Sequence, residues 1–247
     1  MGDVVVEELR AGKPATFIYL TAGDDGRDSI YWQTRESAAL ASTRVANGSA
    51  IGRTDSTECK PVVVARHTLR RCVLGATESY FLRLPDGQRN GSGFSRYNNQ
   101  SLRRLRLSKI SAITAVDGSA TYESWDDLVS TVGELIGSDS GQSARVHTTD
   151  PSVAISPHDH FDHRIAGFLV AQLRKGRSLD VRYYVGYALS TRAPNRSSAQ
   201  AREKTEVFLA YDQEMMRSNK KWSAYREHPA FYSECMMRTY ARTPRAQ

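Results

Sequence analysis

Short apolar runs alternate with amphipathic stretches of helical length along most of this chain, and this alternation limits its fold more than any other feature. Residues 15–20 (ATFIYL) are almost wholly apolar and end in Thr-Ala-Gly, which is typical of a strand buried on both faces of a parallel sheet. A polar loop and a predicted helix at 31–46 follow. Strands that alternate with helices predict an α/β fold with a largely parallel sheet.

The same pattern continues to the C-terminal part of the chain. Further strands are predicted at 61–67, 80–84, 108–116, 145–148 and 181–187, and further helices at 3–10, 124–136, 165–174 and 199–216. The length of 247 residues fits one large domain. We therefore expect a single α/β domain over residues 1–237 and a loose C-terminal tail at 238–247.

Composition excludes several classes of protein. Hydrophobic residues make up 40% of the chain, with 12 Tyr, 7 Phe and 3 Trp, so intrinsic disorder is excluded. No apolar run reaches the ~18–20 residues that a membrane span needs. The net charge of +7 is concentrated in residues 164–247, which hold 16 basic and 7 acidic side chains. These charges are scattered, so we interpret them as a solvated basic face and expect no specific nucleic-acid partner.

The three cysteines, Cys59, Cys72 and Cys235, form neither a disulfide framework nor a zinc-binding pattern. Cys59 and Cys72 can pair, but the sequence does not determine the redox compartment. The opening residues 1–12 are acidic and do not resemble a signal peptide. Cellular compartment and oligomeric state are therefore left open by the sequence.

Three polar clusters follow predicted strands, at residues 21–27, 84–87 and 157–163. Open α/β sheets bind ligands at the carboxyl ends of their strands. We therefore expect the three clusters to form one site, in which Asp86 and His160 lie on the same side of the sheet.

The third cluster is rich in metal-ligating side chains. His158, His160 and His163 lie within six residues, with Asp159 and Asp162 among them. Two histidines three residues apart at a helix start can face one point, and neutral imidazole is a common zinc ligand. A neighbouring carboxylate can fix the tautomer of such a ring. The alternative interpretation is a polar, capped helix entry in which the histidines bind nothing.

The sequence PHDHFDHRIAG resembles the second histidine motif of the PIG-L (LmbE-like) family of zinc-dependent N-deacetylases. The resemblance extends through IYLTAGDDGRDSIYWQTRESAALA, FLRLPDG, VDGSATY and YVGYALSTR, and covers roughly residues 2–211. It implies a Rossmann-like three-layer sandwich. It also implies a hydrolase that removes the acetyl group from N-acetylglucosamine-type sugar conjugates with a zinc-activated water.

The resemblance also implies roles for individual residues. His163 would be the zinc ligand of the second motif, and His160 would stabilise the oxyanion and protonate the leaving amine. Asp162 would orient and tune His160. Asp86 would bind sugar hydroxyls, and Arg35 would also reach the substrate.

Arg35 has a second interpretation, since it stands next to Glu36 on the helix that follows Thr21. An ion pair between Arg35 and Glu36 is weighed equally with substrate binding.

One family motif is missing from the 247 residues. The first motif, His-Pro-Asp-Asp, supplies two metal ligands and the general base at the end of a central first strand, and this sequence lacks it. Asp24-Asp25 is no substitute, because it has no preceding histidine and matches another family segment. Loss of a central strand would also leave neighbouring strand edges unpaired.

Three explanations of the missing motif stay open: a misplaced start codon, a truncated gene, or a non-catalytic protein. We favour the first, in which case a signal peptide could also have been lost. The expected function is thus a zinc-dependent sugar N-deacetylase, inactive as the chain stands and binding zinc weakly. The alternative is a catalytically dead carbohydrate-binding relic of the same fold.

Overall fold

The computed structural model describes residues 1–48, 56–137 and 144–244. The α-helices are α1 Gly2–Arg10, α2 Ser29–Ala46, α3 Leu102–Arg106, α4 Trp125–Ile136, α5 Phe161–Leu173, α6 Ser198–Ser218, α7 Ala224–Glu227 and α8 Pro229–Met236, with 3-10 turns at Ser95–Tyr97 and Tyr187–Thr191. The strands are β1 Ala15–Thr21, β2 Glu58–Val64, β3 His67–Leu74, β4 Thr77–Leu84, β5 Ile113–Thr114, β6 Thr121–Tyr122, β7 Ala144–Thr149, β8 Leu179–Tyr184 and β9 Ala241–Arg242.

The fold is mixed α/β, as predicted, but its strands do not form one largely parallel sheet. A four-stranded sheet has the order β1-β4-β3-β2, a three-stranded sheet has the order β7-β8-β9, and β5 and β6 form a hairpin. In the described part of the chain only the β1–β4 and β7–β8 pairs are parallel, and the other pairs are antiparallel. The expectation of a largely parallel sheet was therefore wrong.

A tight hairpin accounts for much of this difference. The predicted strand at 61–67 is divided by Ala65 and Arg66, which join β2 to β3 and have φ angles of 43° and 69°. Two successive positive φ angles match the two-residue turns that connect antiparallel strands. Such turns usually contain Gly or Asn, so Ala-Arg carried no turn signal, and the β2–β3 pairing was missed.

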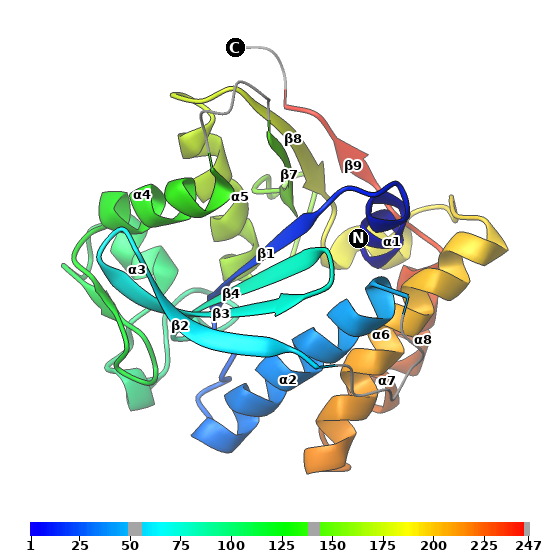
Figure 1. Ribbon diagram of the computed structural model, residues 1–247, viewed down its shortest axis with the longest axis horizontal. Helices are drawn as coiled ribbons and strands as arrows, with labels where there is room; N and C mark the ends of the chain where they lie inside the picture. The colour runs from blue at the N-terminus through cyan, green and yellow to red at the C-terminus, as the bar shows by residue number, and fades with distance from the viewer. Residues whose placement is uncertain (49–55, 138–143, 245–247) are drawn as a thin grey trace.

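Helices cover both faces of the four-stranded sheet (Figure 1). One face packs on α4 and α5 in the largest apolar cluster, which contains Leu69 and Leu82 from the sheet with Leu128 and Ile165 from the helices. The other face packs on α2 through a smaller cluster around Phe81. Helix α6 packs on α2 and α1. Helix α5 also contacts β7, and thereby joins the two sheets.

Strand β1 occupies an edge of its sheet and is less completely buried than predicted, although Ile18 and Leu20 pack on one face of the sheet and Tyr19 on the other. It pairs with β4 on one side only, and none of its seven residues is fully buried. Strand β7 is likewise an edge strand of its sheet. The apolar run was read correctly as a strand, but its position at an edge depends on long-range pairing that the sequence does not encode locally.

The segment expected to be a loose tail is anchored where the structure describes it. Strand β9 pairs antiparallel with β8, and Arg242 forms an ion pair with the buried Asp150. Arg238 and Thr239 are both buried. Residues 245–247 of the predicted tail lie outside the described residues. A long-range ion pair and a two-residue strand leave little trace in sequence periodicity.

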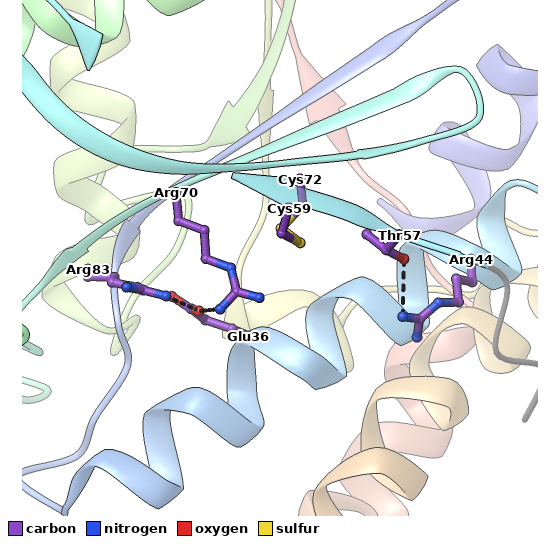
Figure 2. The surroundings of a disulfide bond; sticks show 7 residues. All are labelled: Glu36, Arg44, Thr57, Cys59, Arg70, Cys72 and Arg83. Carbon is purple, nitrogen blue, oxygen red and sulfur yellow. Dashed lines mark hydrogen bonds and ion pairs between the residues drawn. A yellow bond between two sulfur atoms is a disulfide. The ribbon is translucent and has the colours of Figure 1, made fainter. Parts of the chain in front are cut away.

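Two of the three cysteines are joined by a disulfide bond. Cys59 and Cys72 form a disulfide that links β2 to β3, with Cys72 almost completely buried (Figure 2). None of the described helices is long and apolar enough to cross a membrane.

Candidate functional site

The loop after β1 is fastened to the loop after β4 by a buried carboxylate. Asp24 is fully buried, and its Oδ1 accepts a hydrogen bond from the backbone N–H of Asp86 at 2.7 Å. Its Oδ2 accepts from the N–H of Gly26. Burial raises the pKa of Asp24, while these two amide donors oppose the shift. Because backbone N–H groups occupy both of its carboxylate oxygens, Asp24 has a structural role and holds the two loops together.

The loop after β4 brings Asp86 and Gly87 against the entry of α5. The Asp86 Oδ1 lies 3.5 Å from His160 Nε2, and the N–H of Gly87 donates to Asp162 Oδ2 at 2.8 Å. A Cβ atom on Gly87 would lie 2.5 Å from Asp162 Oδ1, so this close approach requires glycine. The prediction that Asp86 and His160 share one site is confirmed.

The entry of α5 orients His160. His160 is the N-cap residue, and its Nδ1 accepts a hydrogen bond from the backbone N–H of Asp162 at 3.3 Å. In this arrangement Nδ1 is the acceptor, so a neutral ring carries its proton on Nε2, facing Asp86. The Asp162 carboxylate, 3.9 Å from Nδ1, is bound mainly by Gly87. Asp162 therefore orients His160 through its backbone amide.

His163 lies one turn further along α5 and is held by Asp159. The Asp159 Oδ1 is 2.8 Å from His163 Nδ1, and the His163 ring is 43% exposed. Such a carboxylate fixes the ring so that Nε2 is available to a ligand. Asp159 itself is enclosed by Gly186, where a Cβ atom would lie 1.7 Å from Asp159 Oδ2. This Oδ2 has no hydrogen-bond partner among the described residues.

Burial moves the acid and the base of this site towards their neutral forms. It lowers the pKa of His160, although the Asp86 charge opposes the shift. It also raises the pKa of Asp162 to about 7, against the hydrogen bond from Gly87. Shifts of this kind, in groups that face each other, are typical of functional sites.

Asp86, His160 and Asp162 form a group that can bind a metal ion. One ligand atom from each residue lies within 4.8 Å of the others. The buried Oδ1 of Asp162 has no hydrogen-bond partner in the described chain, and an uncompensated buried carboxylate oxygen fits a cation. Imidazole and carboxylate suit several divalent ions, so this donor set does not select zinc. His158, also considered a ligand from the sequence, is exposed and is not in this group.

Arg35 does not form the ion pair with Glu36 that the sequence suggested. Glu36 instead binds Arg83, with Nε–Oε1 and Nη2–Oε2 distances of 2.6 and 2.8 Å, and Arg70 at 3.3 Å (Figure 2). Consecutive helical residues point about 100° apart, so Glu36 faces β3 and β4 while Arg35 points elsewhere. The ion-pair interpretation was wrong.

Arg35 points towards aromatic side chains that sequence reasoning missed. Its guanidinium lies 6.0 Å from the Tyr31 ring centroid and 5.9 Å from that of Tyr211 on α6. Its Nε lies against the backbone at Gly23, where a Cβ atom would be 2.7 Å away. Tyr187 is a further aromatic neighbour of the site and contacts the His163 ring edge-on. Tyr211 and Tyr187 come from distant segments that no local pattern connects to Arg35, whereas Tyr31 lies one helical turn before Arg35 on α2.

Comparison with protein-family models, with curated proteins and with solved structures finds no match to this chain.

Proposed function

We propose that this chain carries the substrate side and part of the metal site of a metal-dependent N-deacetylase that acts on N-acetylglucosamine-type sugar conjugates. The observation that carries the proposal is the convergence of Asp86, His160 and Asp162 with the Asp159–His163 pair. The resemblance of PHDHFDHRIAG and FLRLPDG to PIG-L family motifs supplies the reaction class. A Rossmann-like sandwich, as the family implies, is part of the proposal.

In this proposal the metal is ligated by His163 through Nε2. Asp86, His160 and Asp162, whose ligand atoms lie close enough together to hold a cation, are instead given roles towards the substrate, as the family resemblance implies. The 2.8 Å contact with Asp159 supports the role of His163, because it leaves Nε2 as the unprotonated nitrogen. His160 is a weaker metal ligand, since Asp162 N–H and Asp86 engage its two ring nitrogens. A bound divalent ion would polarise the acetamide carbonyl and lower the pKa of a water molecule.

His160 then acts on the substrate. A neutral His160 with its proton on Nε2 can donate to the oxyanion that forms when water adds to the acetamide carbonyl. To protonate the leaving amine, the His160 ring must first gain a second proton and become an imidazolium, a form that the Asp86 charge favours and burial opposes. Asp86, partly exposed beside His160, binds sugar hydroxyls. The buried Asp162 holds both neighbours in place through its N–H and its carboxylate.

The resemblance assigns the general base and two metal ligands to a His-Pro-Asp-Asp motif that the 247 residues do not contain. Groups that act as one unit fail together. We therefore expect no measurable amine release from N-acetylglucosamine conjugates by the 247-residue chain. A form that carries this motif ahead of Gly2 is expected to be active, and His163→Ala and His160→Ala are each expected to reduce its rate at least 100-fold.

An amine-release assay on both forms tests the proposal. Turnover by the 247-residue chain would contradict the assignment of the base to the missing motif. An inactive extended form that still binds sugar would favour the second candidate, a carbohydrate-binding relic. That candidate needs only the sugar-binding side of the site, where the chain brings Asp86 and His160 within 3.5 Å of each other.

A further inference from the structure

The surface formed by α3 and the loops beside it carries positive charge without ion pairs. Residues 87–116 hold six basic side chains and no acidic one: Arg89, Arg96, Arg103, Arg104, Arg106 and Lys109. In the described structure none of the six forms an ion pair with a carboxylate, whereas Arg71 and Arg83 of the neighbouring strands are each paired with a glutamate. Arg89 and Arg104 donate to backbone carbonyl groups instead. This segment is therefore a candidate surface for an anionic partner.

Three guanidinium groups from α3 and α5 form a row on two phenylalanine rings. The Cζ atoms of Arg103 and Arg164 lie 5.0 and 5.1 Å from the centroid of the Phe161 ring. Those of Arg106 and Arg164 lie 4.1 and 5.8 Å from the centroid of the Phe168 ring. Arg164 thus contacts both rings, and we call Arg103, Arg164 and Arg106 the arginine row. A guanidinium that stacks on a ring keeps its in-plane N–H groups for hydrogen bonds to a ligand.

Packing and one backbone contact hold the arginine row in place. The Arg103 side chain lies against the backbone at Gly91, where a Cβ atom would not fit, and its buried Nε has no hydrogen-bond partner among the described residues. The Nε of Arg164 donates to the Pro151 carbonyl at 3.1 Å. Because like charges fixed beside each other repel, an anion bound across the row relieves this repulsion.

Leu107 adds an apolar side chain to the same surface. It is 46% exposed, and its backbone N–H donates to the Arg103 carbonyl one turn earlier, so the two side chains project from the same side of α3. Lys109 is exposed two residues further on. Surfaces that rest on anionic lipid combine basic groups with exposed aliphatic ones. A nucleic-acid backbone offers mainly phosphate and sugar contacts, so the exposed leucine favours lipid.

We propose that the arginine row and Leu107 dock the protein on the surface of an anionic phospholipid membrane. Lipid phosphates bind the guanidinium groups, and Leu107 enters the boundary between headgroups and acyl chains. Phe161 directly follows His160 at the start of α5, so docking brings the candidate site close to the headgroups. The docking surface uses no residue to which the proposed deacetylase function assigns a role.

Co-sedimentation of the 247-residue chain with lipid vesicles tests the proposal. One set of vesicles is pure phosphatidylcholine, and the other also contains about one third phosphatidylglycerol, which supplies the negative surface charge. We expect the chain to partition at least about tenfold more strongly to the anionic vesicles. Because the attraction is electrostatic, raising the salt concentration from about 0.05 M to about 0.5 M should remove most of this difference.

Variants assign the binding to its residues. Arg103→Gln/Arg106→Gln is expected to weaken binding to anionic vesicles at least about tenfold, and Leu107→Ser to weaken it about threefold. Arg202→Gln/Arg217→Gln is the matched control, with an expected loss below about twofold. It removes the same charge from exposed positions on α6, across the molecule from α3 (Figure 1).

A second pair of substitutions keeps the test decisive if Arg103→Gln/Arg106→Gln does not fold. Arg106→Gln/Lys109→Gln leaves the packed Arg103 in place, and a loss of at least about fivefold is expected.

Equal binding to both kinds of vesicle, or binding that the arginine variants do not weaken, would overturn the inference. Binding to a DNA duplex through the same arginines, without binding to anionic vesicles, would also overturn it and would indicate a nucleic-acid partner. The measurement needs no turnover, so an inactive extended form in the amine-release assay would refute the proposed function and leave the membrane surface standing.

Discussion

Replacing Glu36 with glutamine is expected to destabilise the protein strongly. The Glu36 carboxylate is 5% exposed and receives two hydrogen bonds from Arg83, whose side chain is 15% exposed, and one from Arg70 (Figure 2). Removing one partner of a buried ion pair leaves an uncompensated charge and costs about 3–5 kcal/mol. Arg83 keeps a second partner in Asp117, so we expect the lower end, about 3 kcal/mol.

Urea denaturation of wild type and Glu36→Gln measures this difference as a change in the free energy of unfolding. Glu78→Gln is the matched control, because Glu78 is 36% exposed and binds the partly exposed Arg71 across the β3–β4 pair. Such an exposed pair contributes no more than about 1 kcal/mol. A loss in Glu36→Gln no larger than in Glu78→Gln would refute the reasoning.

Three further outcomes are expected. Reduction of Cys59–Cys72, or its replacement by serine, should lower the free energy of unfolding by about 3 kcal/mol, since the loop spans 13 residues; unchanged urea midpoints with and without reductant would contradict this. Gly87→Ala should destabilise the protein by about 1–3 kcal/mol in the same assay, because its Cβ would lie 2.5 Å from the buried Asp162 carboxylate. Burial lowers the pKa of His147, so stability should be lost as pH falls below 6.5, and His147→Gln should lose less between pH 7 and pH 5.

The convergence of the site could be predicted from the sequence. Asp86 lies in the loop directly after β4, and His160 is the N-cap of α5, at the end of the loop that follows β7. The prediction assumed that the strands belong to one parallel sheet, whereas β4 and β7 belong to different sheets, and the two side chains nevertheless lie 3.5 Å apart. Local polarity after an apolar run was sufficient information for this prediction.

The sequence pattern could not predict which side chains form ion pairs or which strands pair with each other. Arg35 and Glu36 are adjacent in sequence, but their side chains point in different directions. Glu36 pairs with Arg83 because β4, which carries Arg83, contacts α2. The hairpin turn at Ala65 and Arg66 could not be predicted, because neither alanine nor arginine is common in such turns. Both features depend on which strands pair, a long-range property that periodicity does not contain.

Zinc titration of the 247-residue chain, with His163→Ala and His158→Ala beside it, tests the central claim that His163 contributes to a metal site that this chain only partly supplies. We predict weak binding that dialysis removes, further weakened at least tenfold by His163→Ala and unchanged by His158→Ala, whose ring is exposed outside the site. One zinc per chain retained through dialysis, or a titration that His163→Ala does not alter, would contradict the account.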